Sequence, residues 1–160
     1  PPPPPTTPQP TTTTTPPPPA APTACVTRTG NDWMLQPCVL QGPTGQVSIG
    51  GGPAVIHIWL QACGDCMPQF NAMKSLRESG RARWSASQYN VAYGRADPSW
   101  AASYGVDENL AFDPRDNFIG PLGIGTFTTL VFNSTGRLVG RYYPTSSDYA
   151  AQVASALATM

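Results

Sequence analysis

The chain has 160 residues, enough for one domain with a buried core, and its formal net charge is zero with only 11% of residues charged. Capture of nucleic acid or of an anionic membrane surface needs clustered positive charge, so we expect neither partner. No apolar run reaches the ~18–20 residues that cross a bilayer, so we expect no membrane span in this sequence.

The first 24 residues differ in composition from the rest, because twelve are proline, eight are threonine and none is charged. Such a segment buries too little apolar surface to offset the entropy lost on ordering. Pro-rich sequence favours polyproline II, which makes a semi-rigid spacer of ~75 Å at full reach. We therefore predict a disordered tether over 1–24 and a folded domain over 25–160, held by an upstream anchor away from an envelope or cell surface.

The first part of the predicted domain contains one hairpin. The stretch from Cys25 to Cys38 is expected to be irregular, because glycine, asparagine, aspartate and proline interrupt it. Two short apolar stretches, Val39–Leu40 and Gln46–Ile49, then flank a turn signal at Gly42–Gly45. This pattern is typical of a β-hairpin.

The next segment, Ala54–Leu60, is apolar on both faces and rich in β-branched residues, as in a strand buried at the centre of a sheet. A helix is expected after it, with apolar residues at every third position of Met67–Leu76 and a glycine stop at Gly80. Beyond this helix we predict a strand over Tyr89–Tyr93. A short helix follows over Pro98–Tyr104, opened by an Asp-Pro pair.

The C-terminal part is predicted to begin with a loop over 105–122. Two strands follow, Thr128–Phe132 and Leu138–Tyr142, joined by a hairpin turn. A final helix over 147–159 is expected to start at a capping serine or aspartate. The whole order of elements predicts an α/β domain with a central mixed sheet and helices on both faces.

Two cysteines, Cys63 and Cys66, stand where the buried strand gives way to the helix. Their spacing allows a disulfide, and the positive end of the helix favours a thiolate on the first sulfur. Cys63, nearer the helix end, would attack a substrate disulfide, and Cys66, one turn inside, would resolve the mixed disulfide. Asp65 complements the helix dipole and also opposes a nearby thiolate.

Two other interpretations of this pair remain open, a structural disulfide and a metal site. So short a loop constrains the unfolded chain little, and a zinc site needs two further ligands. Cys25 and Cys38 do not have metal-site spacing, so we expect no metal here. We expect them instead to form a structural disulfide, whose ~15-residue loop contributes about 3 kcal/mol to stability.

Over about residues 37–160 the sequence resembles the thioredoxin superfamily, and within it the exported TlpA-like thiol–disulfide oxidoreductases. The resemblance rests on Val55–Trp59 running into the pair Cys63–Cys66, and on Gly125–Phe132 followed by Ser134–Val139. It implies a thioredoxin-like fold in which the first hairpin is an N-terminal extension. It also implies electron exchange with protein thiols and disulfides, without a cofactor beyond the cysteine pair. We further expect a monomer that works with a separate electron donor or acceptor.

Three positions depart from the family pattern. Phe127 stands where the family has a cis-proline facing the cysteines. A non-proline cis bond costs ~2.5–4 kcal/mol, so we expect a trans bond before Phe127 and an altered substrate groove. Ala62 replaces a tryptophan that often precedes the first cysteine. His57, the only histidine, stands six residues before that cysteine, where many relatives carry a buried acid or amide.

His57 has two interpretations, either a core histidine with satisfied hydrogen bonds or a proton acceptor for Cys66, since imidazole titrates near pH 6.5. The function also has two. We expect an extracytoplasmic thiol–disulfide oxidoreductase that is periplasmic, envelope-tethered or secreted. The alternative is a redox-silent thioredoxin-fold binding module that uses the surface at Phe127 as an adaptor contact.

Overall fold

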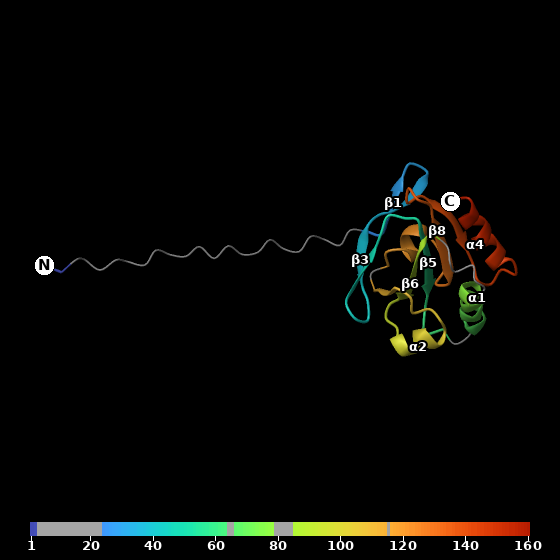
Figure 1. Ribbon diagram of the computed structural model, residues 1–160, viewed down its shortest axis with the longest axis horizontal. Helices are drawn as coiled ribbons and strands as arrows, with labels where there is room; N and C mark the ends of the chain where they lie inside the picture. Colours follow the sequence, from blue (N-terminus) through green and yellow to red (C-terminus); the bar gives the residue numbers. More distant parts are fainter. Residues whose placement is uncertain (3–23, 64–65, 79–84, 115) are drawn as a thin grey trace.

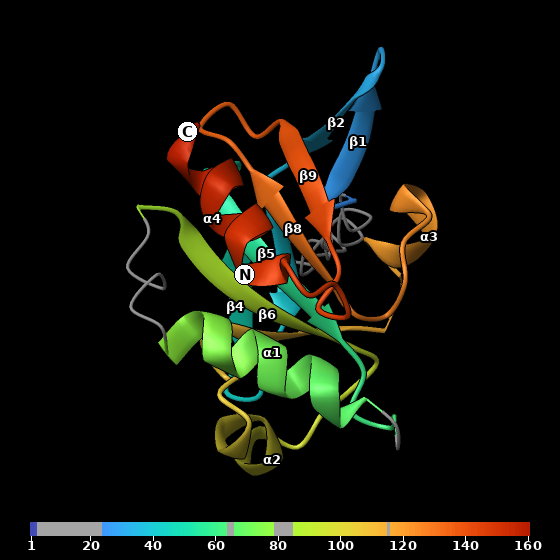
Figure 2. The ribbon, with the colours of Figure 1, turned by 90° about the vertical axis from the view of Figure 1, so that its right-hand side faces the viewer.

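The computed structural model describes residues 1–2, 24–63, 66–78, 85–114 and 116–160. Almost all of the predicted tether lies outside these residues, and so do Asp65 and the glycine stop at Gly80. In the described part, Figures 1 and 2 show a central sheet with helices packed against it. None of the helices described there is long and apolar enough to cross a membrane.

The strands are β1 (Val26–Thr29), β2 (Asp32–Leu35), β3 (Cys38–Gln41), β4 (Gln46–Ile49), β5 (Ala54–Trp59), β6 (Ser87–Tyr93), β7 (Leu110–Asp113), β8 (Thr128–Phe132) and β9 (Leu138–Tyr142). The helices are α1 (Met67–Glu78), α2 (Pro98–Ser103), α3 (Ile119–Leu122) and α4 (Tyr149–Ala158). Seven strands form one sheet in the order β4-β3-β7-β6-β5-β8-β9, and β1 pairs with β2 alone. β5, β6 and β7 run parallel and the other pairings are antiparallel, so the predicted mixed sheet is confirmed.

Strand β5 lies in the middle of the sheet, hydrogen-bonded to β6 and β8, and all six of its residues are buried. Because successive side chains of a strand point to opposite faces, β5 contributes to two cores. Ile56 and Ile58 belong to one core and Trp59 to the other. This arrangement confirms the prediction of a central strand that is apolar on both sides.

The two faces of the sheet are covered differently. Trp59 lies on the face covered by α1 and α4, which we call the helical face, and Figure 2 shows both helices in front of the sheet. The apolar positions Phe70, Met73 and Leu76 of α1 are buried against it, as their spacing predicts. The opposite face is covered by the β1–β2 hairpin and by α3, whose Leu122 is buried there. Helices therefore occupy both faces, but the second face has only a four-residue helix.

The prediction that residues 25–38 are irregular is wrong. The segment forms the β1–β2 hairpin, with Val26 paired to Leu35 across it. Gly30 takes a positive φ of 62° in the two-residue turn, a conformation that glycine adopts without steric cost. Gly30–Asn31 matches a known two-residue hairpin signal, so these residues mark a turn between two strands rather than an interruption.

The prediction of a loop over 105–122 is also wrong, because this segment contains β7 and α3. All four residues of β7 are buried, and β7 lies between β3 and β6 in the sheet. Four residues are too few to show a periodic pattern in the sequence. The strand forms because the neighbouring strands β6 and β3 satisfy its backbone groups.

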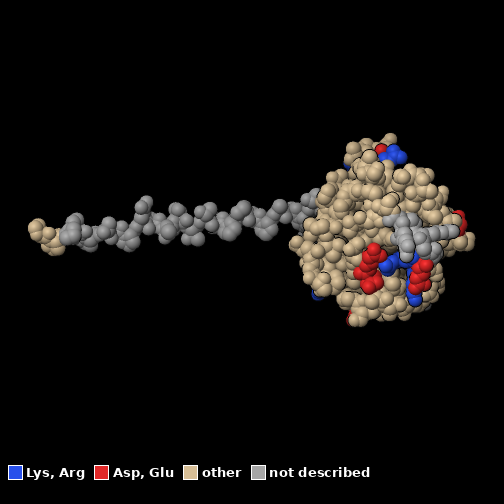
Figure 3. Space-filling view, viewed as in Figure 1, with Lys and Arg blue, Asp and Glu red and all other residues tan. Residues whose placement is uncertain are grey.

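Charged side chains are sparse on the molecular surface, and Figure 3 shows one face that is largely uncharged. Two ion pairs involve α1. Lys74 lies 3.6 Å from Glu78 one turn along the helix, and Arg77 lies 2.7 Å from Glu108 in the segment before β7. Only the second pair links separate parts of the fold, and it ties the C-terminal half of α1 to the central sheet.

Candidate active site

One edge of the sheet brings the predicted site residues together. The carboxyl ends of the parallel strands β5 and β6 lie at this edge, and the antiparallel strand β8 begins there, since Ile58 pairs with Thr128. Cys63 and Cys66 follow β5, and Phe127 immediately precedes β8. The topology therefore places the cysteine pair and Phe127 at the same end of the domain.

Cys63 and Cys66 are joined in a disulfide, with their Cα atoms 5.4 Å apart. Both residues are half-buried. The carbonyl oxygen of Cys66 accepts hydrogen bonds from the backbone N–H groups of Gln69 and Phe70, at 3.1 and 3.2 Å, so Cys66 caps α1. The prediction that Cys66 lies one turn inside the helix is therefore wrong. Pro68 explains the start, because proline is tolerated only in the first turn of a helix.

A hydrogen bond ties the loop before the cysteines to the start of α2. The side-chain oxygen of Gln61 accepts a hydrogen bond of 2.7 Å from the backbone N–H of Asp97. The Asp97 carboxylate in turn accepts one of 3.0 Å from the backbone N–H of Trp100, which makes it the predicted N-cap of α2. The positions of the cysteine loop and α2 are thus linked.

An aromatic cluster lies on the helical face, at the N-terminal turn of α1. Phe70 of α1 is its centre, with its ring centroid 5.6 Å from Trp59, 4.9 Å from Trp100 and 5.0 Å from Phe127, each pair edge to face. Cys66 packs against the same core. The side chain of Phe127 therefore packs on α1, in the same core as Cys66. The bond preceding it is trans, because Gly52–Pro53 is the one cis peptide bond in the described ranges.

His57 lies in β5 on the helical face and has no exposed surface. Its Nδ1 atom is 2.9 Å from the hydroxyl oxygen of Thr129 in β8, and its buried Nε2 atom has no partner among the residues described. Burial, and to a smaller extent the positive charge of Arg77, lowers the pKa of His57 from 6.5 to about 3. The ring is therefore neutral between pH 5 and 8, which argues against the proton acceptor. His57 is a core histidine, with a hydrogen-bond partner at Nδ1 and none at Nε2 among the described residues.

Sequence reasoning missed the residues that surround His57. Thr129 also bonds to the hydroxyl of Tyr149 in α4, at 2.7 Å, and Asn90 of β6 lies opposite His57 in the strand register. A signal for this cluster exists in the sequence, since β5 and β8 each have one polar residue on the helical face and β6 has two, Gln88 and Asn90. That signal becomes readable only after the strand register is known.

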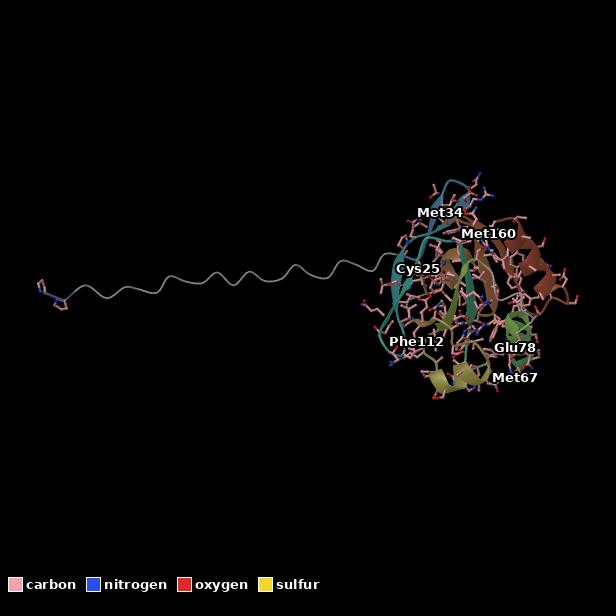
Figure 4. All side chains as sticks on the ribbon, in the orientation of Figure 1. Cys25, Met34, Met67, Glu78, Phe112 and Met160 are labelled. Carbon is pink, nitrogen blue, oxygen red and sulfur yellow. A yellow bond between two sulfur atoms is a disulfide. The ribbon has the colours of Figure 1, made fainter. Side chains whose placement is uncertain are left out.

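Cys25 and Cys38 form a second disulfide, with their Cα atoms 5.2 Å apart. Both are buried in the core under the β1–β2 hairpin. Figure 4 labels Cys25 on one side of the domain and Met67, the neighbour of Cys66, on the other. The two disulfides thus belong to separate regions. No cluster of three or more His, Cys, Asp or Glu side chains suited to a metal ion occurs in the part of the chain described.

Comparison with known proteins identifies the fold. No protein-family model matches the sequence, and no curated protein matches it. A solved structure of a secreted thiol-disulfide isomerase from Corynebacterium glutamicum matches with a TM-score of 0.61 and 14% identity, covering 84% of this chain and 91% of that one. A secreted disulfide oxidoreductase from Mycobacterium tuberculosis matches with a TM-score of 0.53 and 14% identity, covering 76% and 95%.

Apo Sco1 protein from Thermus thermophilus also matches, with a TM-score of 0.52 and 20% identity, covering 88% of this chain and 98% of that one. Together with the sheet order and the place of the cysteine pair, these similarities show that the chain has a thioredoxin-like fold with an N-terminal β-hairpin. Proteins with different names share this fold, so the function has to be argued from the site.

Proposed function

We propose that this thioredoxin-like protein is an extracytoplasmic thiol–disulfide oxidoreductase whose working group is the pair Cys63 and Cys66. One observation carries the proposal: the two residues form a disulfide at the end of the central strand, where α1 begins. Both cysteines are half-buried, so neither residue is enclosed within the core. A disulfide that closes so short a loop adds little to stability, which favours a chemical role over a structural one.

The reaction follows thiol–disulfide exchange. In the reduced protein, the Cys63 thiolate attacks one sulfur of a substrate disulfide, forms a mixed disulfide and expels the other substrate sulfur as a thiolate. Cys66 then loses its proton to solvent and attacks the Cys63 sulfur, which releases the second substrate thiolate. The substrate gains two electrons and two protons, and the protein returns to the Cys63–Cys66 disulfide. A dithiol donor completes the cycle by reducing that disulfide.

The structure supports different roles for the two sulfurs. Cys66 is anchored as the cap of α1 and packs against the aromatic core, whereas Cys63 lies in the preceding loop. A nucleophile has to reach a partner's disulfide, and a resolving cysteine needs only to reach its neighbour. Cys63 is therefore the attacking residue in our proposal and Cys66 the resolving one.

An oxidising compartment agrees with the cysteine chemistry. All four cysteines are paired, and the Cys25–Cys38 disulfide is buried in the core. Structural disulfides of this kind persist outside the cytoplasm. The similar proteins from Corynebacterium glutamicum and Mycobacterium tuberculosis are both described as secreted. The proposed partners are thus protein thiols and disulfides of that compartment.

Reduction of insulin by dithiothreitol tests the proposal. The wild-type protein should accelerate the reaction, and Cys63→Ser should abolish the acceleration. Cys66→Ser should trap mixed disulfides, because attack remains possible without resolution. The matched control is the double variant Cys25→Ser and Cys38→Ser, which should keep the activity while it remains folded. A wild-type rate equal to that of dithiothreitol alone would favour the redox-silent binding module.

Alkylation of the reduced protein tests the two roles separately from the activity. Under mild conditions iodoacetamide should label Cys63 before Cys66, as peptide mass mapping would show. Equal labelling of the two, or faster labelling of Cys66, would contradict the assignment of Cys63 as the attacking residue.

A further inference from the structure

Three buried polar side chains stand side by side on the helical face of the sheet. Asn90 of β6, His57 of β5 and Thr129 of β8 occupy paired register positions on adjacent strands, and none has exposed surface. Helices α1 and α4 cover this face with apolar side chains. Buried polar groups in such surroundings destabilise the fold unless they are hydrogen-bonded, so the direction of each bond can be argued.

The hydroxyl of Thr129 is the centre of a hydrogen-bonded chain. Its oxygen lies 2.9 Å from His57 Nδ1 and 2.7 Å from the hydroxyl oxygen of Tyr149, which α4 contributes to the cluster. Thr129 has one hydroxyl hydrogen and can donate it to one of these neighbours only. It must therefore accept a hydrogen bond from the other, and the chain runs in one of two directions.

In the first direction Tyr149 donates to Thr129, and Thr129 donates to the bare Nδ1 atom of His57. Both hydroxyl hydrogens, of Tyr149 and of Thr129, then have an acceptor. The neutral ring carries its proton on Nε2. In the second direction His57 donates from Nδ1 to Thr129, and Thr129 donates to Tyr149. The Tyr149 hydrogen then has no acceptor among the described residues, which costs about 1–3 kcal/mol for a buried hydroxyl.

Asn90 gives an independent argument for the first direction. Its side-chain nitrogen donates a 2.8 Å hydrogen bond to the carbonyl oxygen of Glu108, which fixes the orientation of the amide. The Oδ1 atom of Asn90 is then left buried without a partner in the described structure, as is Nε2 of His57 on the neighbouring strand. A proton on Nε2 makes these two atoms a donor and an acceptor, which one buried water can bridge. In the second direction both are acceptors.

We propose that Tyr149 and Thr129 are positioning residues that hold His57 as the neutral tautomer with its proton on Nε2, so that neither ring nitrogen offers a free lone pair to a cysteine proton. The nearby groups agree with a neutral ring. Arg77 of α1 is positively charged and opposes protonation, whereas Asn90, Thr129 and Tyr149 from the other elements are neutral. Burial raises the pKa of Tyr149 above its ordinary value, so its hydroxyl keeps its hydrogen. This inference goes beyond the proposed function and does not rest on it.

Nitrogen-15 NMR of the full chain tests the proposal directly, because His57 is the only histidine and gives the only imidazole signals. At pH 7 the Nε2 signal should have the shift of a protonated ring nitrogen, and the Nδ1 signal that of a bare one. The opposite assignment would overturn the proposal. The same pattern should persist after reduction with excess dithiothreitol. Imidazolium signals in the reduced protein would show that His57 had taken a cysteine proton.

Variants test the positioning roles. In Tyr149→Phe the Thr129 hydroxyl loses its donor and is free to accept from Nδ1, so the two nitrogen shifts should move toward each other as both tautomers become populated. Thr129→Ser keeps the hydroxyl and should keep the wild-type shifts. Tyr143→Phe, at an exposed tyrosine, is the matched control and should leave the shifts unchanged. Wild-type shifts in a folded Tyr149→Phe protein would show that Tyr149 does not determine the tautomer of His57.

Discussion

The ring of His57 is buried in β5, and its surroundings make protonation unfavourable. Its pKa is about 3 in the folded protein, against 6.5 for the exposed group. Between these two values the unfolded chain binds more protons than the folded one, so the free energy of unfolding falls as the pH is lowered from about 6.5 to about 3. The residue thus links the packing of the helical face to the acid stability of the whole domain.

Replacing His57 with asparagine should remove this pH dependence. Urea unfolding of wild type and His57→Asn between pH 3 and pH 8 measures it. The stability difference should change in favour of the variant at low pH, by up to about 5 kcal/mol at about 1.36 kcal/mol per pKa unit. The carboxylates are common to both proteins, so they cancel in the comparison. Parallel stability curves would contradict the low pKa of His57.

Phe127 adds an apolar ring at the end of the domain that holds the cysteine pair. The ring packs edge to face on Phe70, in the core against which Cys66 also packs. We expect this bulk to slow exchange with protein disulfides more than exchange with a small disulfide such as oxidised glutathione.

The ratio of the two exchange rates tests the role of Phe127. Phe127→Pro should lower the ratio of the glutathione rate to the protein-disulfide rate severalfold. Phe127→Leu keeps an apolar side chain of similar bulk and should leave it close to the wild-type value. An unchanged ratio in a folded Phe127→Pro protein would mean that Phe127 does not control access.

At the scale of elements, the capping of α2 offers a test with its own control. Asp97 bonds the backbone N–H of Trp100, whereas Asp148, which caps α4, makes no such side-chain bond and accepts instead from Gln152. Asp97→Ala should therefore cost about 0.5–2 kcal/mol in urea unfolding. Asp148→Ala should cost only a few tenths of a kcal/mol, because an exposed hydrogen bond is its main loss. Equal losses would show that the Asp97 bond adds nothing.

Elements with a strong local pattern were predictable from the sequence, and two short elements were not. The apolar run of β5, the three-residue spacing of α1 and the Asp-Pro start of α2 each reflect a local physical rule, and all three are confirmed. Strand β7 has four residues and depends on pairing with β6 and β3, which no local pattern contains. The cysteine pair was also predictable, because the spacing of Cys63 and Cys66 is a local pattern of the sequence. The Thr129–Tyr149 bond was not, because it joins residues whose proximity only the fold creates.

At the scale of the whole molecule, the division of the chain remains a prediction. Cys25 is buried immediately before β1, in the core beneath the hairpin. If 1–24 is a tether outside that core, its deletion removes no packing. The melting temperature of a 25–160 protein should then equal that of the full chain within error. A loss of several degrees would mean that the segment packs on the domain.

The Cys25–Cys38 disulfide also decides how the domain carries mechanical load. A pull applied on the N-terminal side of Cys25 passes through the bond between sulfurs to Cys38, at the start of β3. The β1–β2 hairpin lies in the closed loop between them and carries no tension while the bond is intact. Reduction would put the hairpin in series with the load and release roughly 40 Å of chain. For a domain held at a surface by its N-terminal side, the oxidation state of this buried pair would therefore set the stiffness of the attachment.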